Sequence, residues 1–139
     1  MTKKTFEARA IGYVESTLTD LESAPLQGDE GAPDAVLVLD AEILAALEGL
    51  RPGDELLVLT WLDRAHRDVL QVHPRGDRSR APQGVFNTRS PHRPNPIGLH
   101  RVTIRGIDGA RVTVQNLEAL NETPILDMKP ILSSDPTDR

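Results

Sequence analysis

The sequence predicts a mainly β fold, an antiparallel β-barrel of about six to seven strands with one or two short helices. Short apolar or alternating segments recur along the chain, and turns separate them, supplied by 10 Gly and 11 Pro among 139 residues. No Gly-x-Gly-x-x-Gly follows a strand, which disfavours a doubly wound nucleotide-binding fold. We expect one domain over residues 1–139, with frayed ends at 1–5 and 133–139.

The chain begins with an expected strand over residues 6–14, in which Gly12 indicates a bulge or a close approach of another backbone. Residues 18–33 are acidic and rich in turn formers. The apolar run at 35–39 has the length of a strand.

Asp40 is placed to cap a short helix over residues 41–48. A turn over 51–54 then leads to residues 55–62, the most apolar strand and the expected centre of the sheet. The apolar face of the helix is formed by Ile43, Leu44 and Leu47.

Residues 69–73 alternate as a further strand, and residues 74–83 follow as a basic loop. The loop is either solvated or engages a nucleic-acid backbone. Its arginines are Arg75, Arg78 and Arg80.

The clearest local signal is a hairpin of residues 99–107 and 111–117, joined by a type I′ turn at Asp108-Gly109. Val102 and Ile104 are expected to point inward from its first strand.

Residues 84–99 form a polar segment that contains Pro91, Pro94 and Pro96. Proline removes a backbone donor and fixes φ, so neither a helix nor a central strand can run through this segment. We expect a rigid loop between two buried segments, although a chance Pro-x-x-Pro surface loop is the alternative. The apolar flanks are Val85, Phe86, Ile97 and Leu99.

Charge is segregated along the chain, although the net charge is -5. Residues 64–105 hold 9 Arg against 2 acids, a net of +7, and the flanks hold 7 basic and 19 acidic residues, a net of -12. The segregation indicates a basic patch that meets an anion, unless flanking acids pack beside these arginines. The chain lacks Cys, an apolar leader and a bilayer-length apolar run, which favours a cytoplasmic protein.

Residues 84–99 also carry a resemblance, together with the run Thr123-Pro124-Ile125-Leu126-Asp127-Met128-Lys129-Pro130. Over residues 10–132 the chain resembles the TsaA-like (TrmO-type) methyltransferases. The resemblance implies a β-barrel, usually dimeric, that uses S-adenosyl-L-methionine and no metal. Characterised members methylate N6 of a modified adenosine (t6A) next to the anticodon of tRNA, so tRNA and a second copy of the chain are the expected partners.

The resemblance also implies the site. A cation such as Arg89 suits the carboxylate of the donor, and Leu62 and Leu99 suit walls for its adenine. We expect the reaction centre at Arg93, Asn95, Asp127 and Lys129, although Asp127 and Lys129 could equally form a structural ion pair. The donor-binding positions implied by the family are Leu26, Gln27, Leu62, Asp63, Arg89, Leu99, Glu118, Ala119, Leu120 and Asn121.

The chain departs from the family pattern at three places. The family often has His where this chain has Asp63, and Asp-Gly where it has Asn121-Glu122, which removes a glycine suited to positive φ. The chain also ends soon after the second motif, whereas long members carry a further C-terminal domain, so another acceptor is conceivable.

Two other functions stay open on the residues alone: a methyltransferase of the same fold that acts on a small molecule, and a non-enzymatic module that binds an anion or a partner. A metal hydrolase is disfavoured because the four histidines lack the spacing of zinc motifs.

Overall fold

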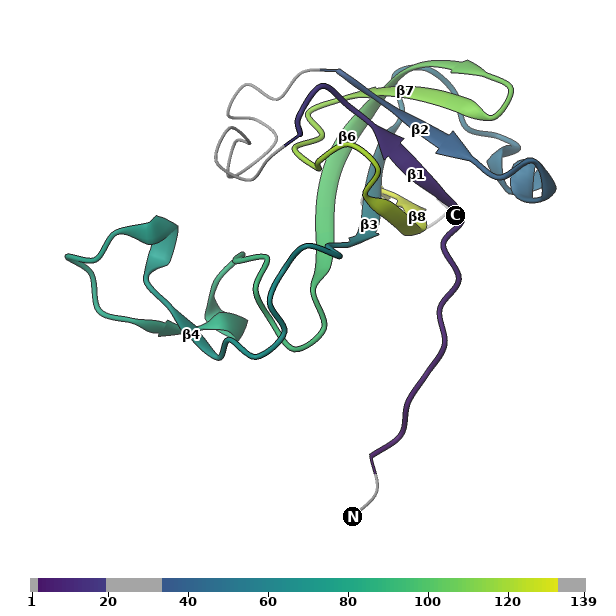
Figure 1. The fold of residues 1–139 in the computed structure, drawn as a ribbon. Coiled ribbons are helices and arrows are strands. Elements are labelled where there is room, and N and C mark those ends of the chain that lie inside the picture. The colour runs from purple at the N-terminus through teal and green to yellow at the C-terminus, as the bar shows by residue number, and fades with distance from the viewer. Residues whose placement is uncertain (1–2, 20–33, 133–139) are drawn as a thin grey trace.

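A computed structural model describes residues 3–19 and 34–132 of the chain. Six antiparallel strands close into a barrel in the order β1-β2-β7-β6-β3-β8, which confirms the predicted fold class (Figure 1). The strands are β1 (Gly12–Glu15), β2 (Ala35–Leu39), β3 (Glu55–Trp61), β6 (Ile97–Asp108), β7 (Arg111–Gln115) and β8 (Pro124–Pro130).

The core is built by alternation, because every second residue of each strand faces the barrel interior. β2 follows the predicted bounds, and its burial alternates from Ala35 to Leu39. β3 pairs with β6 on one side and β8 on the other. Every strand of a closed barrel has two partners, so the expected central position does not distinguish β3 from the other strands. The largest fully buried side chains include Leu37, Leu56, Ile104, Leu117 and Ile125.

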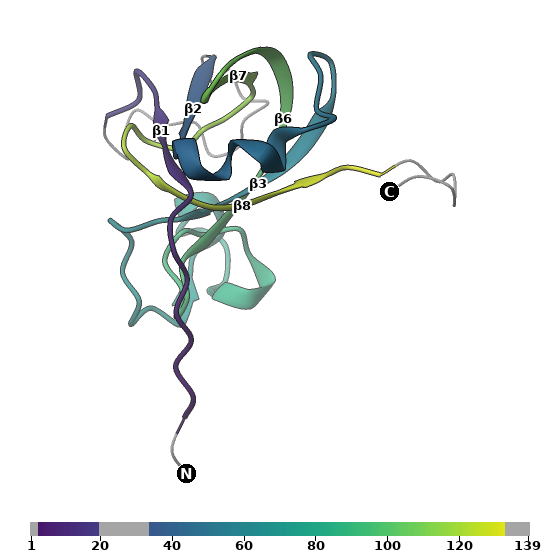
Figure 2. The same cartoon turned by 90° about the vertical axis from the view of Figure 1, so that its right-hand side faces the viewer.

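The predicted first strand is too long. The strand begins only at Gly12, although Ile11 still bonds Ile125 and Asp40 through its backbone. Residues 3–10 are exposed and run away from the barrel as an extended arm (Figures 1 and 2). The short partner strand limits β1, because β2 offers a register of four residues only. Phe6 is therefore 83% exposed. The close approach expected at Gly12 is present, since a β-carbon there would overlap the carbonyl oxygen of Val38.

The helix is a 3-10 helix, η2 (Ala41–Leu47), which lies on the side of the barrel opposite residues 62–96 (Figures 1 and 2). Asp40 precedes it without a side-chain capping bond, contrary to the expected cap. The 3-10 winding explains this, because the Ile43 N–H donates to the backbone carbonyl of Asp40 instead. Leu47 is buried, and Ile43 and Leu44 pack half-buried against the core, as predicted.

The β6–β7 hairpin is present, with Val102, Ile104, Val112 and Val114 inside. Its turn is not type I′. Asp108 pairs with Arg111, and of the two linking residues only Gly109 has positive φ, at 58°. Positive φ at the first central residue alone fits type II′, so the hairpin prediction was right and its turn type wrong.

Residues 62–96 form a lobe between β3 and β6, outside the barrel (Figure 1). The predicted strand at 69–73 shrinks to two residues. The lobe contains β4 (Gln71–Val72), η3 (Pro74–Gly76), β5 (Gln83–Gly84) and η4 (Val85–Asn87).

Only part of the expected apolar flank of the proline segment is buried. Val85 is buried, whereas Phe86 is 80% exposed. Ile97 and Leu99 start β6 earlier than predicted and point outward, because the inward positions of this part of β6 are Gly98 and His100.

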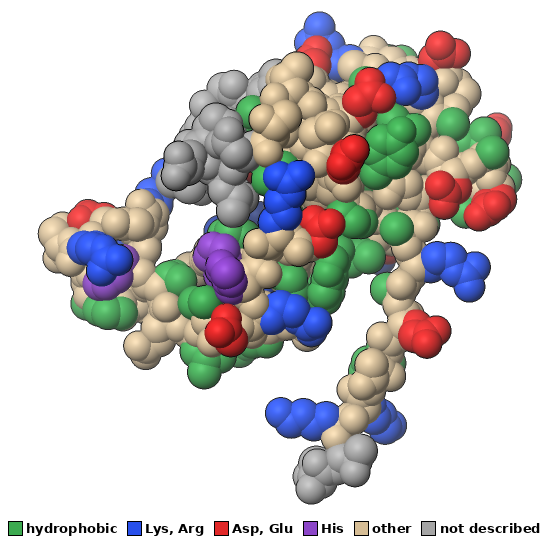
Figure 3. Space-filling model, viewed as in Figure 1, with side chains coloured by type: hydrophobic (Ala, Val, Ile, Leu, Met, Phe, Trp, Pro, Cys, Tyr) green, Lys and Arg blue, Asp and Glu red, His purple; other side chains and the backbone are tan. Residues whose placement is uncertain are grey.

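Acidic side chains gather on the upper and right-hand parts of the barrel in Figure 3. Glu55 of β3 packs beside Arg101 of β6 with an Nε–Oε2 distance of 2.9 Å, and this guanidinium lowers the pKa of the Glu55 carboxyl. Flanking acids therefore do neutralise one central arginine. Within residues 3–19 and 34–132, no helix is long and apolar enough to cross a membrane.

Candidate functional site

A cavity of about 790 Å³ opens between the lobe and the barrel, where β3 ends and β6 begins. Figure 3 shows the hollow between these two parts of the molecule. Its wall combines apolar, cationic and anionic groups, as a site for a polar organic ligand requires. Six residues that represent its lining are Leu62, Arg89, Arg93, Leu99, His100 and Glu118.

The cavity brings together most of the expected donor-binding positions. Asn121 lies outside the lining, because its Oδ1 accepts a bond from the Ser16 N–H and its N–H donates to Leu18 O. Leu26 and Gln27 lie outside the described residues. The positions that do line the cavity are Leu62, Asp63, Arg89, Leu99, Glu118, Ala119 and Leu120.

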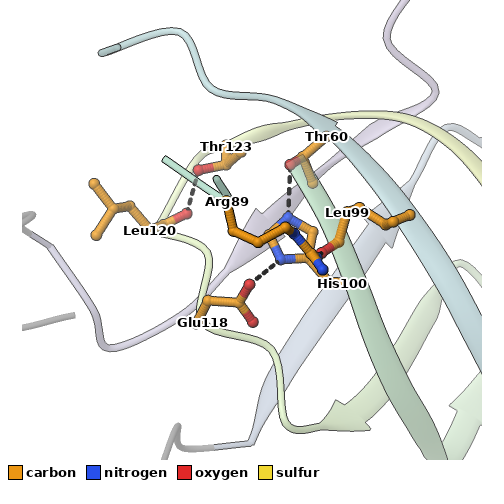
Figure 4. A network of polar contacts seen from close by, with 7 residues as sticks. All are labelled: Thr60, Arg89, Leu99, His100, Glu118, Leu120 and Thr123. Atoms are coloured by element: carbon orange, nitrogen blue, oxygen red, sulfur yellow. Dashed lines mark hydrogen bonds and ion pairs between the residues drawn. The ribbon is translucent and has the colours of Figure 1, made fainter. Parts of the chain in front are cut away.

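Arg89 reaches the cavity from a loop whose residues hydrogen-bond to one another. The Thr88 N–H donates to Val85 O at 3.1 Å, and the Ser90 N–H donates to Thr88 Oγ1 at 3.2 Å. Arg93 closes the same bend, since its Nη1 donates to Thr88 O and Ser90 O. With the prolines restricting φ, these bonds keep the Arg89 backbone in place. Its guanidinium donates to Leu99 O at 3.0 Å, beside the cavity (Figure 4).

Asn95 lies outside the cavity lining, and its side chain forms a hydrogen bond within the lobe instead. Its Oδ1 accepts a bond of 3.0 Å from Arg67 Nη2, and Arg67 Nε donates to Pro94 O at 2.7 Å. The same guanidinium lies 5.2 Å above the Trp61 ring, within cation–π range. Arg67 thus links the proline segment to the end of β3.

Asp127 and Lys129 project from one face of β8, as their spacing predicts, and both side chains are exposed. A bulge at Leu59/Thr60 sets this register between β3 and β8. The two charges form a loose ion pair, with an Nζ–Oδ2 distance of 3.9 Å, away from the cavity lining.

The tertiary structure reveals a polar chain that sequence reasoning missed. Thr60 Oγ1 lies 2.7 Å from His100 Nε2, and His100 Nδ1 lies 2.6 Å from Glu118 Oε1 (Figure 4). Thr60 and His100 are buried, at 0% and 4% exposure, and Glu118 is 19% exposed at the cavity. A signal existed, because the alternation of β6 puts His100 on the same inward face as Val102 and Ile104.

A second histidine, His92, lies at the lobe side of the cavity. Its Nδ1 accepts a 3.0 Å bond from the His66 N–H, and the two rings lie 5.1 Å apart. Burial lowers the pKa of His92, and the neighbouring His66 charge lowers it further. The neutral ring is therefore the form that fits this loop.

A smaller cavity of about 620 Å³ adjoins the first one, and residues 88–92 line both. None of the described residues that line it is Asp or Glu, so this part of its wall attracts anions. The basic and imidazole groups on it are His73, Arg75, Arg78, Arg80, Arg89 and His92.

The departure at Asn121-Glu122 has a visible consequence. Glu122, which stands at the glycine position of the family, adopts φ 70°. The turn is held from outside, because the Glu122 N–H donates to Val14 O at 2.6 Å. Asn121, which tolerates positive φ more readily than Glu, is not among the residues with positive φ. Among the residues that the structure describes, no group of three or more His, Asp or Glu is arranged to hold a metal ion.

The chain is similar to known proteins in both sequence and fold. Residues 13–135 match the model of the tRNA-methyltransferase O N-terminal domain family. A probable S-adenosyl-L-methionine-binding protein of Archaeoglobus fulgidus is 39% identical over 128 residues, which cover 92% of this chain and 34% of that protein. A second protein of that organism, named an S-adenosyl-L-methionine-binding protein, is 40% identical over 124 residues, covering 87% of this chain and 86% of its own length.

The fold is also similar to the crystal structure of TrmO from Pseudomonas aeruginosa, with a TM-score of 0.75 at 27% identity. The match covers 98% of this chain and 61% of that one, so the chain spans less than two thirds of that protein. By sequence and by fold, the chain belongs to the tRNA-methyltransferase O N-terminal domain family.

Proposed function

We propose that this protein is an S-adenosyl-L-methionine-dependent N-methyltransferase whose acceptor is N6 of the modified adenosine (t6A) next to the anticodon of tRNA. One observation carries the proposal: the self-bonded proline segment places Arg89 in a cavity that is also lined by Leu62, Leu99 and Glu118. The names of the family and of its relatives support it.

The chemical groups of the donor match the wall of this cavity. Arg89 offers a planar fork for the donor's carboxylate, although one of its donors is engaged by Leu99 O. Leu62 and Leu99 offer apolar surface for an adenine, and Glu118 offers carboxylate oxygen for hydroxyl groups.

Methyl transfer from a sulfonium is an in-line displacement, so the protein contributes chiefly by holding donor and acceptor aligned. An N6 amine is a weak nucleophile because its lone pair is delocalised, and it sheds a proton as the new bond forms. The protein must therefore present an acceptor oxygen to the amine. The described part of the cavity wall carries the carboxylates of Glu55, Asp63 and Glu118, of which Glu55 is engaged by Arg101.

The second cavity supports a polyanionic acceptor, because its described lining carries cationic groups and no Asp or Glu. It shares the wall at residues 88–92 with the donor cavity. A phosphate backbone in the second cavity would therefore bring a base to the first, and Arg78 and Arg80 would contact it.

We also propose that the protein forms a homodimer through the outward face of β3 and β6. Leu59 and Trp61 of β3 pair in register with Leu99 and Ile97 of β6. Ile97 and Leu99 are 44% and 43% exposed and also line the larger cavity, so a second copy would cover apolar surface at the rim of that cavity. Sedimentation velocity checks the mass, and Ile97→Lys shifts a dimer of this kind to monomer.

Isothermal titration with S-adenosylhomocysteine tests the donor site, and mass spectrometry of tRNA from a strain lacking the gene tests the acceptor. We expect micromolar binding and the loss of one methylated adenosine. No measurable heat at high micromolar ligand removes the proposal. Binding without a change in tRNA leaves a methyltransferase with a small-molecule acceptor, the alternative that the sequence left open.

A further inference from the structure

We infer that His100 is a positioning residue that aims the Glu118 carboxylate at a vicinal diol, the free ribose of the donor. The inference rests on the proposed donor site and specifies how that site recognises its ligand. It starts from the Thr60–His100–Glu118 chain, which lies outside the two motifs.

The imidazole has no rotational freedom left. Thr60 Oγ1 lies 2.7 Å from Nε2, and Glu118 Oε1 lies 2.6 Å from Nδ1. An ionised carboxylate only accepts, so Nδ1 carries a proton and donates to Glu118. The Thr60 hydroxyl can then donate to Nε2, and both ring nitrogens are satisfied inside the barrel.

Among the described residues, the one side-chain partner of Glu118 is His100, which holds one of its two oxygens. Its Oε1 takes the bond from His100, and the carboxyl lies on the wall of the cavity with 19% of the side chain exposed. Among the described residues, no ion pair joins Glu118 to an arginine, although Arg64, Arg89, Arg93 and Arg101 line the same cavity. The lone pairs that His100 does not use are thus available to a ligand.

Adjacent hydroxyls are neutral donors that suit a carboxylate fixed in this way, because two O–H groups can reach one carboxyl group together. The chemistry also discriminates between ligands. A ribose inside an RNA chain has its 3′ oxygen esterified, whereas the ribose of S-adenosyl-L-methionine carries both hydroxyls. Glu118 would therefore select the donor over an internal nucleotide of the acceptor.

The test compares two ligands on the full chain by isothermal titration: S-adenosylhomocysteine and its 2′,3′-dideoxy analogue. Wild-type protein should bind the first about 10- to 100-fold more tightly, as expected for hydrogen bonds to a charged group. We call the affinity for S-adenosylhomocysteine divided by that for the dideoxy analogue the affinity ratio. Glu118→Gln should erase most of this ratio and leave affinity for the dideoxy analogue within about threefold of wild type.

The role of His100 is tested by a matched pair of variants. His100→Asn keeps an N–H near the position of Nδ1 and should retain most of the ratio, whereas His100→Leu removes the donor and should lose it. If His100→Leu does not fold, Thr60→Val and Thr60→Ser replace this pair of variants. Thr60→Val should lower the affinity ratio, because it removes the hydroxyl that bonds His100, and Thr60→Ser should keep it. Near-ultraviolet circular dichroism of Trp61 verifies the fold of each variant.

Two results overturn the inference while the donor site stands: a wild-type protein that binds both ligands equally, or a folded His100→Leu variant that keeps the full ratio. A protein that binds neither ligand overturns the proposed function together with the inference.

Discussion

A β-carbon built on Gly98 would overlap the hydroxyl oxygen of Thr60, which faces it across the β3–β6 pair, and would lie 2.7 Å from Nε2 of His100. Glycine at this position leaves the space through which the hydrogen bond between Thr60 and His100 passes. The glycine of the Ile-Gly-Leu in the first motif is thus explained by packing against Thr60 and His100.

Gly98→Ala should lower the free energy of unfolding by about 1–3 kcal/mol, because the added methyl overpacks a buried site. Urea denaturation measures it. Gly106→Ala on the same strand is the matched control, since nothing lies within 4 Å of a β-carbon there and its φ is not positive. Equal midpoints for the two variants would contradict the packing role of Gly98.

Glu122→Gly should stabilise the protein by about 0.5–1 kcal/mol, the relief of a left-handed residue less the entropy cost of glycine. Glu122 has φ 70°. Asn116→Gly, also at φ 70°, should gain less because Asn tolerates this region. Thermal unfolding of both variants checks the order, and a destabilised Glu122→Gly would show that the side chain has a role of its own.

Arg89→Ala should weaken donor binding by about 10- to 100-fold if its fork holds the donor's carboxylate. The donor affinity of Arg89→Lys should lie between those of wild type and Arg89→Ala, since a single ammonium cannot bind two oxygens in a fork. Titration with S-adenosylhomocysteine measures both. Arg105→Ala is the control, because Arg105 bonds Gln115 and lies outside the lining of both cavities. Unchanged affinity in Arg89→Ala would remove Arg89 from the site.

Arg78→Ala combined with Arg80→Ala should weaken tRNA binding and reduce the salt slope of log K by about 2, one for each phosphate contact. Donor affinity should stay unchanged, since neither residue lines the larger cavity. Filter binding at several salt concentrations gives the slope. A slope equal to that of wild type would place the nucleic acid elsewhere.

The pKa of His92 should lie below the usual value near 6.5 in the folded protein. The folded state then holds fewer protons, so stability is complete above that value and declines as pH falls through it. Protonation of Nδ1 would also remove the acceptor for the His66 N–H. Titration of the His92 ring by NMR checks the shift. His66→Asn should raise the pKa only in part, because burial is the larger cause.

The sequence alone determined the class of fold, most of its strands and the family. Alternation and turn residues are local properties, so β2, β3 and the β6–β7 hairpin were predictable from their own residues. The proline segment likewise predicted its own rigidity, since proline acts on its own φ and on its neighbour.

Only the tertiary structure decided which polar groups meet. Thr60 and His100 are 40 residues apart, and His100 and Glu118 are 18 apart, so the pairing of strands makes the chain between them. Pairing also decided where the first strand starts, because Gly12 is the first residue in register with β2. The bulge between β3 and β8 turned Asp127 and Lys129 outward. Contacts across a barrel depend on register and closure, which no single segment encodes by itself.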